Sequence, residues 1–298
     1  MKYLSIILFT LFISTSCCGA KVVKEKASEK IAQIEAPKIS ESPKTSEIII
    51  EEVQQPKEVE TETIIEKPIV EDIVKAEKII IKPQEAFNHS AWNDLLQKYV
   101  SNQGNVNYKG FKTEHTALKN YIQSLSKNTP TETWTRADKL AYWMNAYNAL
   151  TVDLIVRHYP LKSIKDINSP WGQRLWKLGS KWYNLEEIEH QILRKMNEPR
   201  IHFGIVCASI SCPKLQNTAF EASKIEAQLN KATKEFLADT TKNNLSKNSI
   251  KISKIFKWFS SDFKENGSLV DFINKYSEIV ISQNASKSYK DYDWNLNE

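Results

Sequence analysis

The chain has 298 residues, of which 41% are hydrophobic and 26% charged, and a formal net charge of +5. The lysines are spread along the sequence and form no basic stripe with interleaved aromatic residues, so a nucleic-acid partner is not expected. All eight tryptophans lie after residue 91, which places the aromatic core in the C-terminal two thirds of the chain.

Residues 1–17 have the features of a lipoprotein-type signal peptide. A basic start is followed by an apolar run of about ten residues, too short to span a bilayer, and then by small residues before Cys17. We expect cleavage to leave Cys17 as the lipid-modified N-terminus, although cleavage after Ala20 is an alternative. In both cases the protein is exported. Lipidation of Cys17 would anchor it to a membrane, facing the periplasm or the cell surface.

Residues 18–85 are predicted to be a disordered tether rich in Lys, Glu, Pro and Ile. Positions 21–85 contain neither glycine nor an aromatic residue, and five prolines interrupt any long helix or central strand. The remaining chain, residues 86–298, has enough aromatic area for the core of one domain.

Hydrophobic spacing predicts helices over residues 90–100, 114–126 and 136–158. The last of these is apolar around nearly its whole circumference, which indicates a central helix packed on all sides. It contains Asn145 and Asn148 on one face, and buried amides must be hydrogen-bonded. The two amides would either pin a neighbouring loop or orient a catalytic group. Tyr147, on the same helix, is a candidate binding residue.

Residues 161–183 are predicted to form an ordered loop and a hairpin-like turn. Trp171 and Trp176 in this region are candidates to line a groove for a peptide, glycan or protein partner. A helix over residues 185–194 follows, with His190 near the edge of its apolar face.

The stretch 200–213 concentrates the reactive side chains of the folded region. Ile201–Val206 is predicted to be a buried strand that runs into a turn or helix start. Cys207 and Cys212 are the only cysteines outside the targeting segment, so the thiol chemistry of the domain lies here.

The rest of the chain alternates between short predicted elements. A helix is expected over 218–239, a strand over 245–252, and helical pieces over 256–263 and 269–280. The aromatic and acidic tail at 289–295 is expected to dock on the core. The predicted fold class is therefore α+β, a helix-rich single globular domain with a small central sheet.

Several separate motifs in this region resemble those of one protein family. They are Asn145-Ala-Tyr-Asn148, Ile188-Glu-His-Gln-Ile-Leu-Arg194, Arg200-Ile-His-Phe203, Cys207-Ala-Ser-Ile-Ser-Cys-Pro213, Lys254-Ile-Phe-Lys-Trp-Phe259 with Asp262-Phe263, and Tyr292-Asp-Trp-Asn-Leu296. From about Phe87 to the C-terminus the chain resembles the bacterial and plant family of unknown function DUF547. A papain- or transglutaminase-like fold is an analogy that goes with this resemblance.

The first functional hypothesis is thiol-dependent hydrolysis or acyl transfer on a peptide-like substrate. Cys207 would be the nucleophile, activated by free N–H groups of the turn that also form an oxyanion site. The base would be His202 or His190, oriented by Asn145, Asn148 or Asp293. In a regular strand His202 and Cys207 point to opposite faces, so His190 is an equal candidate.

The alternative is a non-catalytic envelope binding or scaffold module with a structural Cys207–Cys212 disulfide. The oxidising export compartment favours such a bridge. In that case the tryptophan-rich loop and the aromatic tail, including Asp293, would form the binding surface. Neither a metal site nor a cofactor is expected, because the five histidines lack metal-ligand spacing and there is no glycine-rich phosphate loop.

Overall fold

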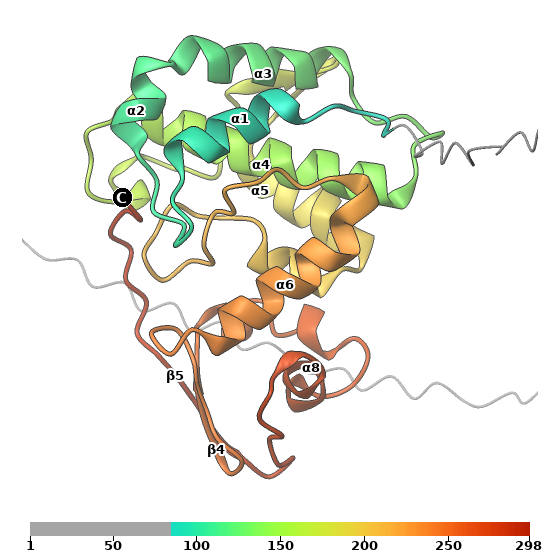
Figure 1. Cartoon of the computed structure of the whole chain (residues 1–298), viewed down its shortest axis with the longest axis vertical. Helices are drawn as coiled ribbons and strands as arrows, with labels where there is room; N and C mark the ends of the chain where they lie inside the picture. Colours follow the sequence, from blue (N-terminus) through green and yellow to red (C-terminus); the bar gives the residue numbers. More distant parts are fainter. Residues whose placement is uncertain (1–84) are drawn as a thin grey trace, which may run out of the picture. The chain divides into compact units, whose positions relative to one another are not determined.

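The structure, a computed structural model, describes residues 85–298. The predicted signal peptide, Cys17 and nearly all of the predicted tether lie outside the described residues. The described part is helix-rich with small sheets of two and three strands, which confirms the predicted α+β class (Figure 1).

Four α-helices form the N-terminal layer, and the last of them is buried along most of its length. They are α1 (Ser90–Tyr99), α2 (Tyr108–Thr113), α3 (His115–Lys127) and α4 (Arg136–His158). Thr135 and Asp138 form a capping box at the start of α4. Every residue from Leu140 to Val156 is buried, as the apolar circumference of this segment predicted. Helices α2 and α3 pack directly on α4 (Figure 1).

A short hairpin and one irregular helical segment follow α4. After the 3-10 turn η1 (Ile164–Asp166) come β1 (Trp176–Leu178) and β2 (Lys181–Tyr183), which pair antiparallel. The helical segment begins as α5 (Leu185–Glu187), widens into the π-helical η2 (Ile188–Leu193) and ends as the 3-10 turn η3 (Arg194–Met196).

The predicted strand at 201–206 is wrong: this stretch begins in a 3-10 helix, η4 (Pro199–Phe203). Pro199 stands at the start of the helix, and the Glu198 side chain caps it by accepting a hydrogen bond from the Arg200 N–H. Ile201 and Phe203 belong to two different core clusters. The run is apolar because the helix is buried on several sides. Periodicity alone does not distinguish such a helix from a buried strand.

The C-terminal half surrounds the second core cluster. Its helical elements are η5 (Ala222–Lys224), α6 (Ile225–Ala238), α7 (Ile255–Trp258), η6 (Asp262–Lys264) and α8 (Leu269–Tyr276). Its strands are β3 (Asn244–Leu245), β4 (Ser249–Ile252) and β5 (Ser286–Tyr289), in the order β3-β4-β5, with β4 antiparallel to β3 and parallel to β5. The strand predicted over 245–252 is thus a hairpin.

The C-terminal segment docks on the core, as the sequence predicted. Leu296 is buried and forms a bridge with Ser209, and Asn295 forms a bridge with Ser163. The Val106 N–H donates to the Asn297 carbonyl. This segment therefore runs beside the loop that carries both cysteines.

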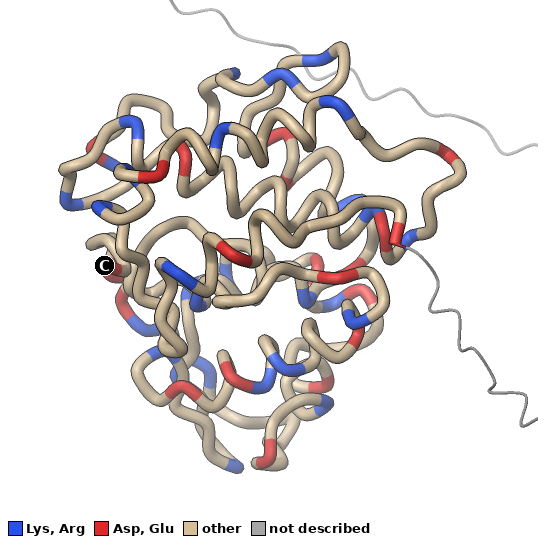
Figure 2. The backbone as a smooth tube through the Cα atoms, turned by 45° about the horizontal axis from the view of Figure 1, so that its top comes forward, with Lys and Arg blue, Asp and Glu red and all other residues tan. Residues whose placement is uncertain are grey.

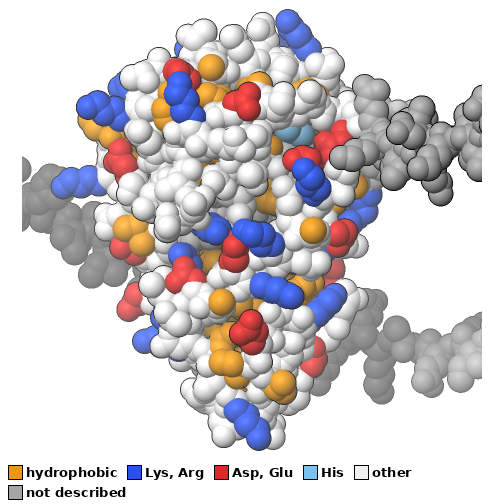
Figure 3. Space-filling view, viewed as in Figure 1, with side chains coloured by type: hydrophobic (Ala, Val, Ile, Leu, Met, Phe, Trp, Pro, Cys, Tyr) orange, Lys and Arg blue, Asp and Glu red, His pale blue; other side chains and the backbone are white. Residues whose placement is uncertain are grey.

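Charged residues of both signs are interspersed over the described part of the chain. Figure 2 shows Lys and Arg alternating with Asp and Glu along the backbone, and Figure 3 shows the same mixture on one face. Among residues 85–298, none of the helices has both the length and the apolar character that crossing a membrane requires.

Candidate thiol site

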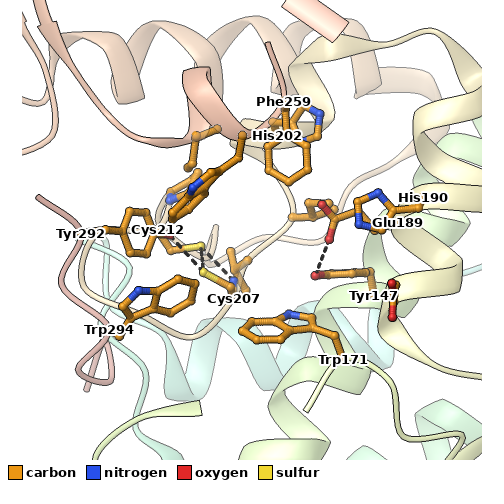
Figure 4. A pocket seen from close by; sticks show the side chains of 16 residues that line it. Tyr147, Trp171, Glu189, His190, His202, Cys207, Cys212, Phe259, Tyr292 and Trp294 are labelled. Carbon is orange, nitrogen blue, oxygen red and sulfur yellow. Dashed lines mark hydrogen bonds between the residues drawn. The ribbon is translucent and has the colours of Figure 1, made fainter. Parts of the chain in front are cut away.

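A cavity of about 340 Å³ lies where the cysteine loop meets the helical segment 185–196 and the C-terminal tail (Figure 4). The residues that line it are Tyr147, Trp171, Glu186, Glu189, His190, His202, Ile205, Val206, Cys207, Cys212, Pro213, Ile255, Trp258, Phe259, Tyr292 and Trp294. Six of the residues that the sequence singled out therefore meet here: Tyr147, Trp171, His190, His202, Cys207 and Cys212. The other four described candidates, Asn145, Asn148, Trp176 and Asp293, do not line this cavity.

Cys207 stands at a sharp bend in the chain. The next residue, Ala208, has a φ of +55°, a left-handed conformation that costs a non-glycine residue about 1 to 2 kcal/mol. Strained backbone positions of this kind cluster at functional sites. The bend leaves Cys207 partly exposed at the cavity while Ala208 and Ser209 are buried behind it.

Three side chains surround the Cys207 sulfur. Its Sγ lies 2.9 Å from the Sγ of Cys212, 3.2 Å from the Tyr292 hydroxyl and 3.3 Å from the Ser209 hydroxyl. Hydrogen bonds from these groups, with Cys212 the largest contributor, lower the pKa of the Cys207 thiol, although burial and the charge of Glu189 act in the opposite direction.

The neighbouring groups keep their protons. Burial raises the pKa of the Cys212 thiol well above its ordinary value, and burial likewise raises the pKa of the Tyr292 hydroxyl. The pair is therefore asymmetric. As thiols, Cys207 donates to the Cys212 sulfur, and when Cys207 ionises the Cys212 thiol becomes the donor to its thiolate.

The source of this activation differs from the expectation. The N–H groups of Ile210, Ser211 and Cys212 donate to backbone carbonyls, and the Cys207 N–H donates to the Cys212 sulfur. These four backbone donors are therefore engaged, two within the loop and those of Ile210 and Ser211 by the C-terminal tail. The hydrogen bonds that lower the pKa of Cys207 come from side chains, whereas the sequence predicted that free N–H groups of a turn would lower it.

Asn148 fixes the backbone that leads into Cys207. Its Nδ2 donates to the Gly204 carbonyl at 2.9 Å, and its Oδ1 accepts from the Val206 N–H at 3.0 Å. Asn145 makes the equivalent pair of bonds with the carbonyl and N–H of Phe220, at 2.8 and 3.0 Å. Both amides thus hold neighbouring loops against α4, and that of Asn148 positions the backbone just before Cys207.

The two histidines belong to one hydrogen-bonded chain. Arg194 donates its Nε and Nη2 to Asp262 at 2.7 and 2.6 Å, and its Nη1 lies 2.8 Å from the His190 Nδ1. The His202 Nε2 lies 2.9 Å from the same Asp262 carboxylate, and its ring stacks on Phe259. Burial raises the pKa of Asp262, but hydrogen bonds from Arg194 and His202 outweigh it and hold that pKa well below its ordinary value.

This chain of bonds defines the state of His190. Because a guanidinium can only donate, the His190 Nδ1 accepts, and the proton of the neutral ring lies on Nε2. Within residues 85–298, no hydrogen bond joins Cys207 to His190 or His202. The sequence analysis placed His202 and Cys207 on opposite faces of a strand. This argument does not apply, because His202 lies in the helix η4 and both residues line the cavity.

Glu189 faces the cysteine pair across the cavity (Figure 4). Its Oε2 accepts a hydrogen bond from the Tyr147 hydroxyl at 2.9 Å. Glu189 and His190 both lie in the π-helical turn η2 and both line the cavity. π-Helical turns occur frequently at functional sites.

Trp176 and Asp293 have other surroundings. The indole N–H of Trp176 donates to the buried Asp153 at 2.7 Å, on α4. Asp293 does not line the cavity. Its backbone N–H donates to the Ser211 hydroxyl at 2.8 Å, and its backbone carbonyl accepts from the Ser211 N–H at 3.2 Å. Asp293 thereby fastens the tail to the cysteine loop.

Sequence reasoning missed Glu189 and Trp258 in the cavity, and Asp262 as the partner of His202. It expected the aromatic tail to form part of a binding surface, but it did not place the Tyr292 hydroxyl beside the Cys207 sulfur. The family-like motifs around Asp262 and Tyr292 contained the signal for these two residues, but their distance in sequence from Cys207 gave no reason to place them beside it. Residues 85–298 contain no group of three or more His, Cys, Asp or Glu side chains arranged to hold a metal ion.

Comparison with known proteins finds one family model, which matches part of the chain and names no activity. Residues 131–237 match the family model described as "Protein of unknown function, DUF547". No curated protein and no solved structure matches the chain. The papain- or transglutaminase-like relation therefore stays a prediction.

Proposed function

We propose that the domain is a thiol-dependent hydrolase or acyl transferase that acts on a peptide-like substrate, with Cys207 as its nucleophile. The observation that supports this most directly is the position of the Cys207 sulfur. It lines a cavity, with the thiol of Cys212 and the hydroxyls of Ser209 and Tyr292 within 3.3 Å. A thiolate stabilised in this way is a nucleophile at neutral pH.

The chemical step follows from this arrangement. The Cys207 thiolate attacks the substrate carbonyl carbon and forms a C–S bond. The tetrahedral intermediate then expels the leaving amine or alcohol, which takes a proton from the Cys212 thiol or the Tyr292 hydroxyl; the water or amine that attacks next returns this proton. Water or an acceptor amine attacks the resulting thioester and releases Cys207 as a thiolate. Tyr292 and Cys212 are the protonated groups in contact with the reacting sulfur. His190 or His202 would act from the opposite wall, through the bound substrate.

Acylation by 4-nitrophenyl acetate tests the proposal. The reduced domain is expected to release nitrophenol in a burst and to acquire one acetyl group on the peptide that contains Cys207. Cys207→Ala should abolish both signals, whereas Ser180→Ala, at an exposed position in the turn between β1 and β2, should retain them. A folded wild-type domain whose Cys207 remains unacetylated would contradict the proposal.

One observation favours the alternative of a structural bridge. The two sulfurs lie 2.9 Å apart as free thiols, and a disulfide bond of about 2.05 Å requires only a small further approach. Bridging would transfer two electrons to an oxidant such as a small disulfide and would remove the nucleophile. The domain would then be an envelope binding or scaffold module, with the aromatic rim of Trp171, Trp258 and Trp294 as its binding surface.

The thiol state of protein purified from the envelope distinguishes the two proposals. Alkylation before and after reduction, followed by mass spectrometry, counts the free thiols. Two free thiols, with Cys207 alkylated rapidly at neutral pH, support the enzyme. A complete Cys207–Cys212 bridge that resists mild reduction supports the scaffold.

We further propose that the protein is exported and held at a membrane by a lipid on Cys17. The support is the small-residue approach to Cys17 after a short apolar run. Replacing both Cys17 and Cys18 by alanine should move the protein from the membrane fraction to the soluble fraction and abolish its labelling with radioactive palmitate. Unchanged membrane association would contradict the anchor.

A further inference from the structure

The cavity that contains Cys207 is lined by two carboxylates, Glu186 and Glu189, by two histidines, and by no lysine or arginine. Arg194, on the same helical segment as Glu189, hydrogen-bonds the Asp262 carboxylate and the His190 ring. Its charge acts on Glu189 only from a distance, without a hydrogen bond between the two side chains. Among residues 85–298, no lysine or arginine is therefore in direct contact with the Glu189 carboxylate.

Glu189 is the informative member of this lining. It is only 8% exposed, and its carboxylate points into the cavity (Figure 4). Its Oε2 accepts the Tyr147 hydroxyl, while its Oε1 has no hydrogen-bond partner in the described part of the chain and is not sealed from solvent. An ionised carboxylate that is nine-tenths buried is costly unless it is paired, so this oxygen is an open acceptor for a cation.

The walls on either side suit the same kind of group. Trp171, Phe259, Tyr292 and Trp294 present aromatic rings to the cavity, and aromatic faces attract ammonium and guanidinium groups. A carboxylate within an aromatic enclosure is a recognition site for an organic cation.

We propose that Glu189 binds a cationic nitrogen of the substrate, so that the site selects acyl compounds with an amine or guanidinium group near the attacked carbonyl. This inference rests on the proposed function and specifies its substrate class. Peptides with a free α-amino group or a basic side chain have this chemistry. Glu186, which is exposed at the same wall, would favour the approach of the same substrates.

Cation binding would also assist the nucleophile. The charge of Glu189 acts to raise the pKa of Cys207, which shows that the two groups interact across the cavity. A bound cation offsets this effect and leaves the thiolate more favoured. A substrate that carries the cation therefore activates the sulfur that attacks it.

The charge selectivity of Cys207 alkylation tests the proposal without knowledge of the natural substrate. Three reagents are compared on the reduced domain: neutral iodoacetamide, anionic iodoacetate and an iodoacetamide that carries a trimethylammonium group. Each rate at Cys207 is measured by peptide mass spectrometry and divided by the rate with a small uncharged thiol. Glu189→Gln can still accept the Tyr147 hydrogen bond, and Glu132→Gln, an exposed site outside the cavity, is the control for net charge.

The expected result is a normalised preference for the cationic reagent over iodoacetate of at least about tenfold, as for a unit charge interacting at a protein surface. This preference should fall severalfold in Glu189→Gln and stay unchanged in Glu132→Gln. A ratio near one, or a ratio that Glu189→Gln leaves unchanged, would overturn the proposal. The ratio is the readout because removing Glu189 also raises the reactivity of Cys207 toward all three reagents.

A second measurement does not depend on the thiol. Benzyltrimethylammonium should quench tryptophan fluorescence in the Cys207→Ala variant, and benzyl alcohol at the same concentration should not. Loss of this binding in Glu189→Gln supports the cation site even if Cys207 proves unreactive toward esters, in which case only the proposed enzyme fails. Equal binding of both compounds overturns the cation site and leaves the acylation result unaffected.

Discussion

Replacement of Cys212 by alanine tests the origin of Cys207 reactivity. The hydrogen bond from the Cys212 thiol is the largest of the effects that lower the pKa of Cys207. Because a lowered pKa keeps the thiolate populated at lower pH, loss of this donor must move the ionisation of Cys207 to higher pH. The variant also cannot form the Cys207–Cys212 bridge, so its behaviour reports on hydrogen bonding alone.

The size of the effect follows from the energy of one charged hydrogen bond. Such a bond contributes about 1.5 to 3 kcal/mol, and about 1.4 kcal/mol corresponds to a factor of ten. At a pH below the pKa of both proteins, the thiolate population should therefore fall by roughly tenfold to a hundredfold. Intrinsic nucleophilicity rises with thiol pKa, with a coefficient of about 0.4 to 0.5, and recovers about half of this loss on a logarithmic scale. The net alkylation rate should fall by roughly three- to tenfold.

The assay is the pH dependence of iodoacetamide alkylation at Cys207 under reducing conditions. The two pH profiles should cross, because the variant reacts more slowly near neutral pH and faster on its alkaline plateau. Ser209→Ala and Tyr292→Phe remove the weaker donors and should shift the profile in the same direction by less. A Cys212→Ala profile that coincides with that of the wild type would refute the assignment of Cys212 as the activating donor.

Three further predictions concern stability, measured by urea unfolding. Burial lowers the pKa of His89 to about 4, so the unfolded chain binds a proton at this side chain at higher pH than the folded one does. Stability is therefore lost as pH falls below 6.5, and the free energy of unfolding should drop by about 2 kcal/mol between pH 7 and 5. His89→Phe should flatten this pH dependence. Asn148→Ala should cost about 2 to 5 kcal/mol, because two buried backbone groups before Cys207 lose their partners; a cost below 1 kcal/mol would contradict this role. Gly104→Ala should cost at least about 1 kcal/mol, since φ is +87° and the new Cβ would lie 2.3 Å from the Lys214 Cβ, whereas a neutral effect would show that the turn can relax.

The helical layer could be predicted because its signals are local. The three helices expected over residues 90–158 are present, with every end within one residue of the prediction. Helix α4 was recognisable as central since charged residues are nearly absent from its middle turns. The tail was expected to dock because its aromatic residues need burial. In each case the sequence pattern and the final environment agree.

The stretch before Cys207 could not be assigned from its pattern. A short apolar run fits a buried strand or a buried helical turn equally well, and here two core clusters bury it from both sides. The Pro199 start and the Glu198 cap were the local signs of a helix. Once η4 replaced the strand, the argument that separated His202 from Cys207 lost its basis.

The partners of the nucleophile were beyond the reach of local reasoning. Tyr292 lies 85 positions after Cys207, and Asp262 lies 60 positions after His202. Hydrophobic periodicity reports which face of an element is buried, but it does not report which distant segment covers that face. Glu189 was inconspicuous for a different reason, since an acidic residue on a helix normally faces solvent.

The residues of the cavity lie partly inside and partly outside the range that matches the family model. Residues 131–237 include Glu189, Cys207 and Cys212, and thus both the proposed nucleophile and the proposed cation acceptor. Tyr292, a hydrogen-bond partner of the Cys207 sulfur, and the aromatic rim of Trp258 and Trp294 come from outside that range. The segment that supplies Tyr292 also fastens the cysteine loop through backbone hydrogen bonds at positions 209–211. The matched region therefore contains Cys207 without all of the side chains that hydrogen-bond its sulfur, and the proposed activation of this thiol would depend on the docked C-terminal tail.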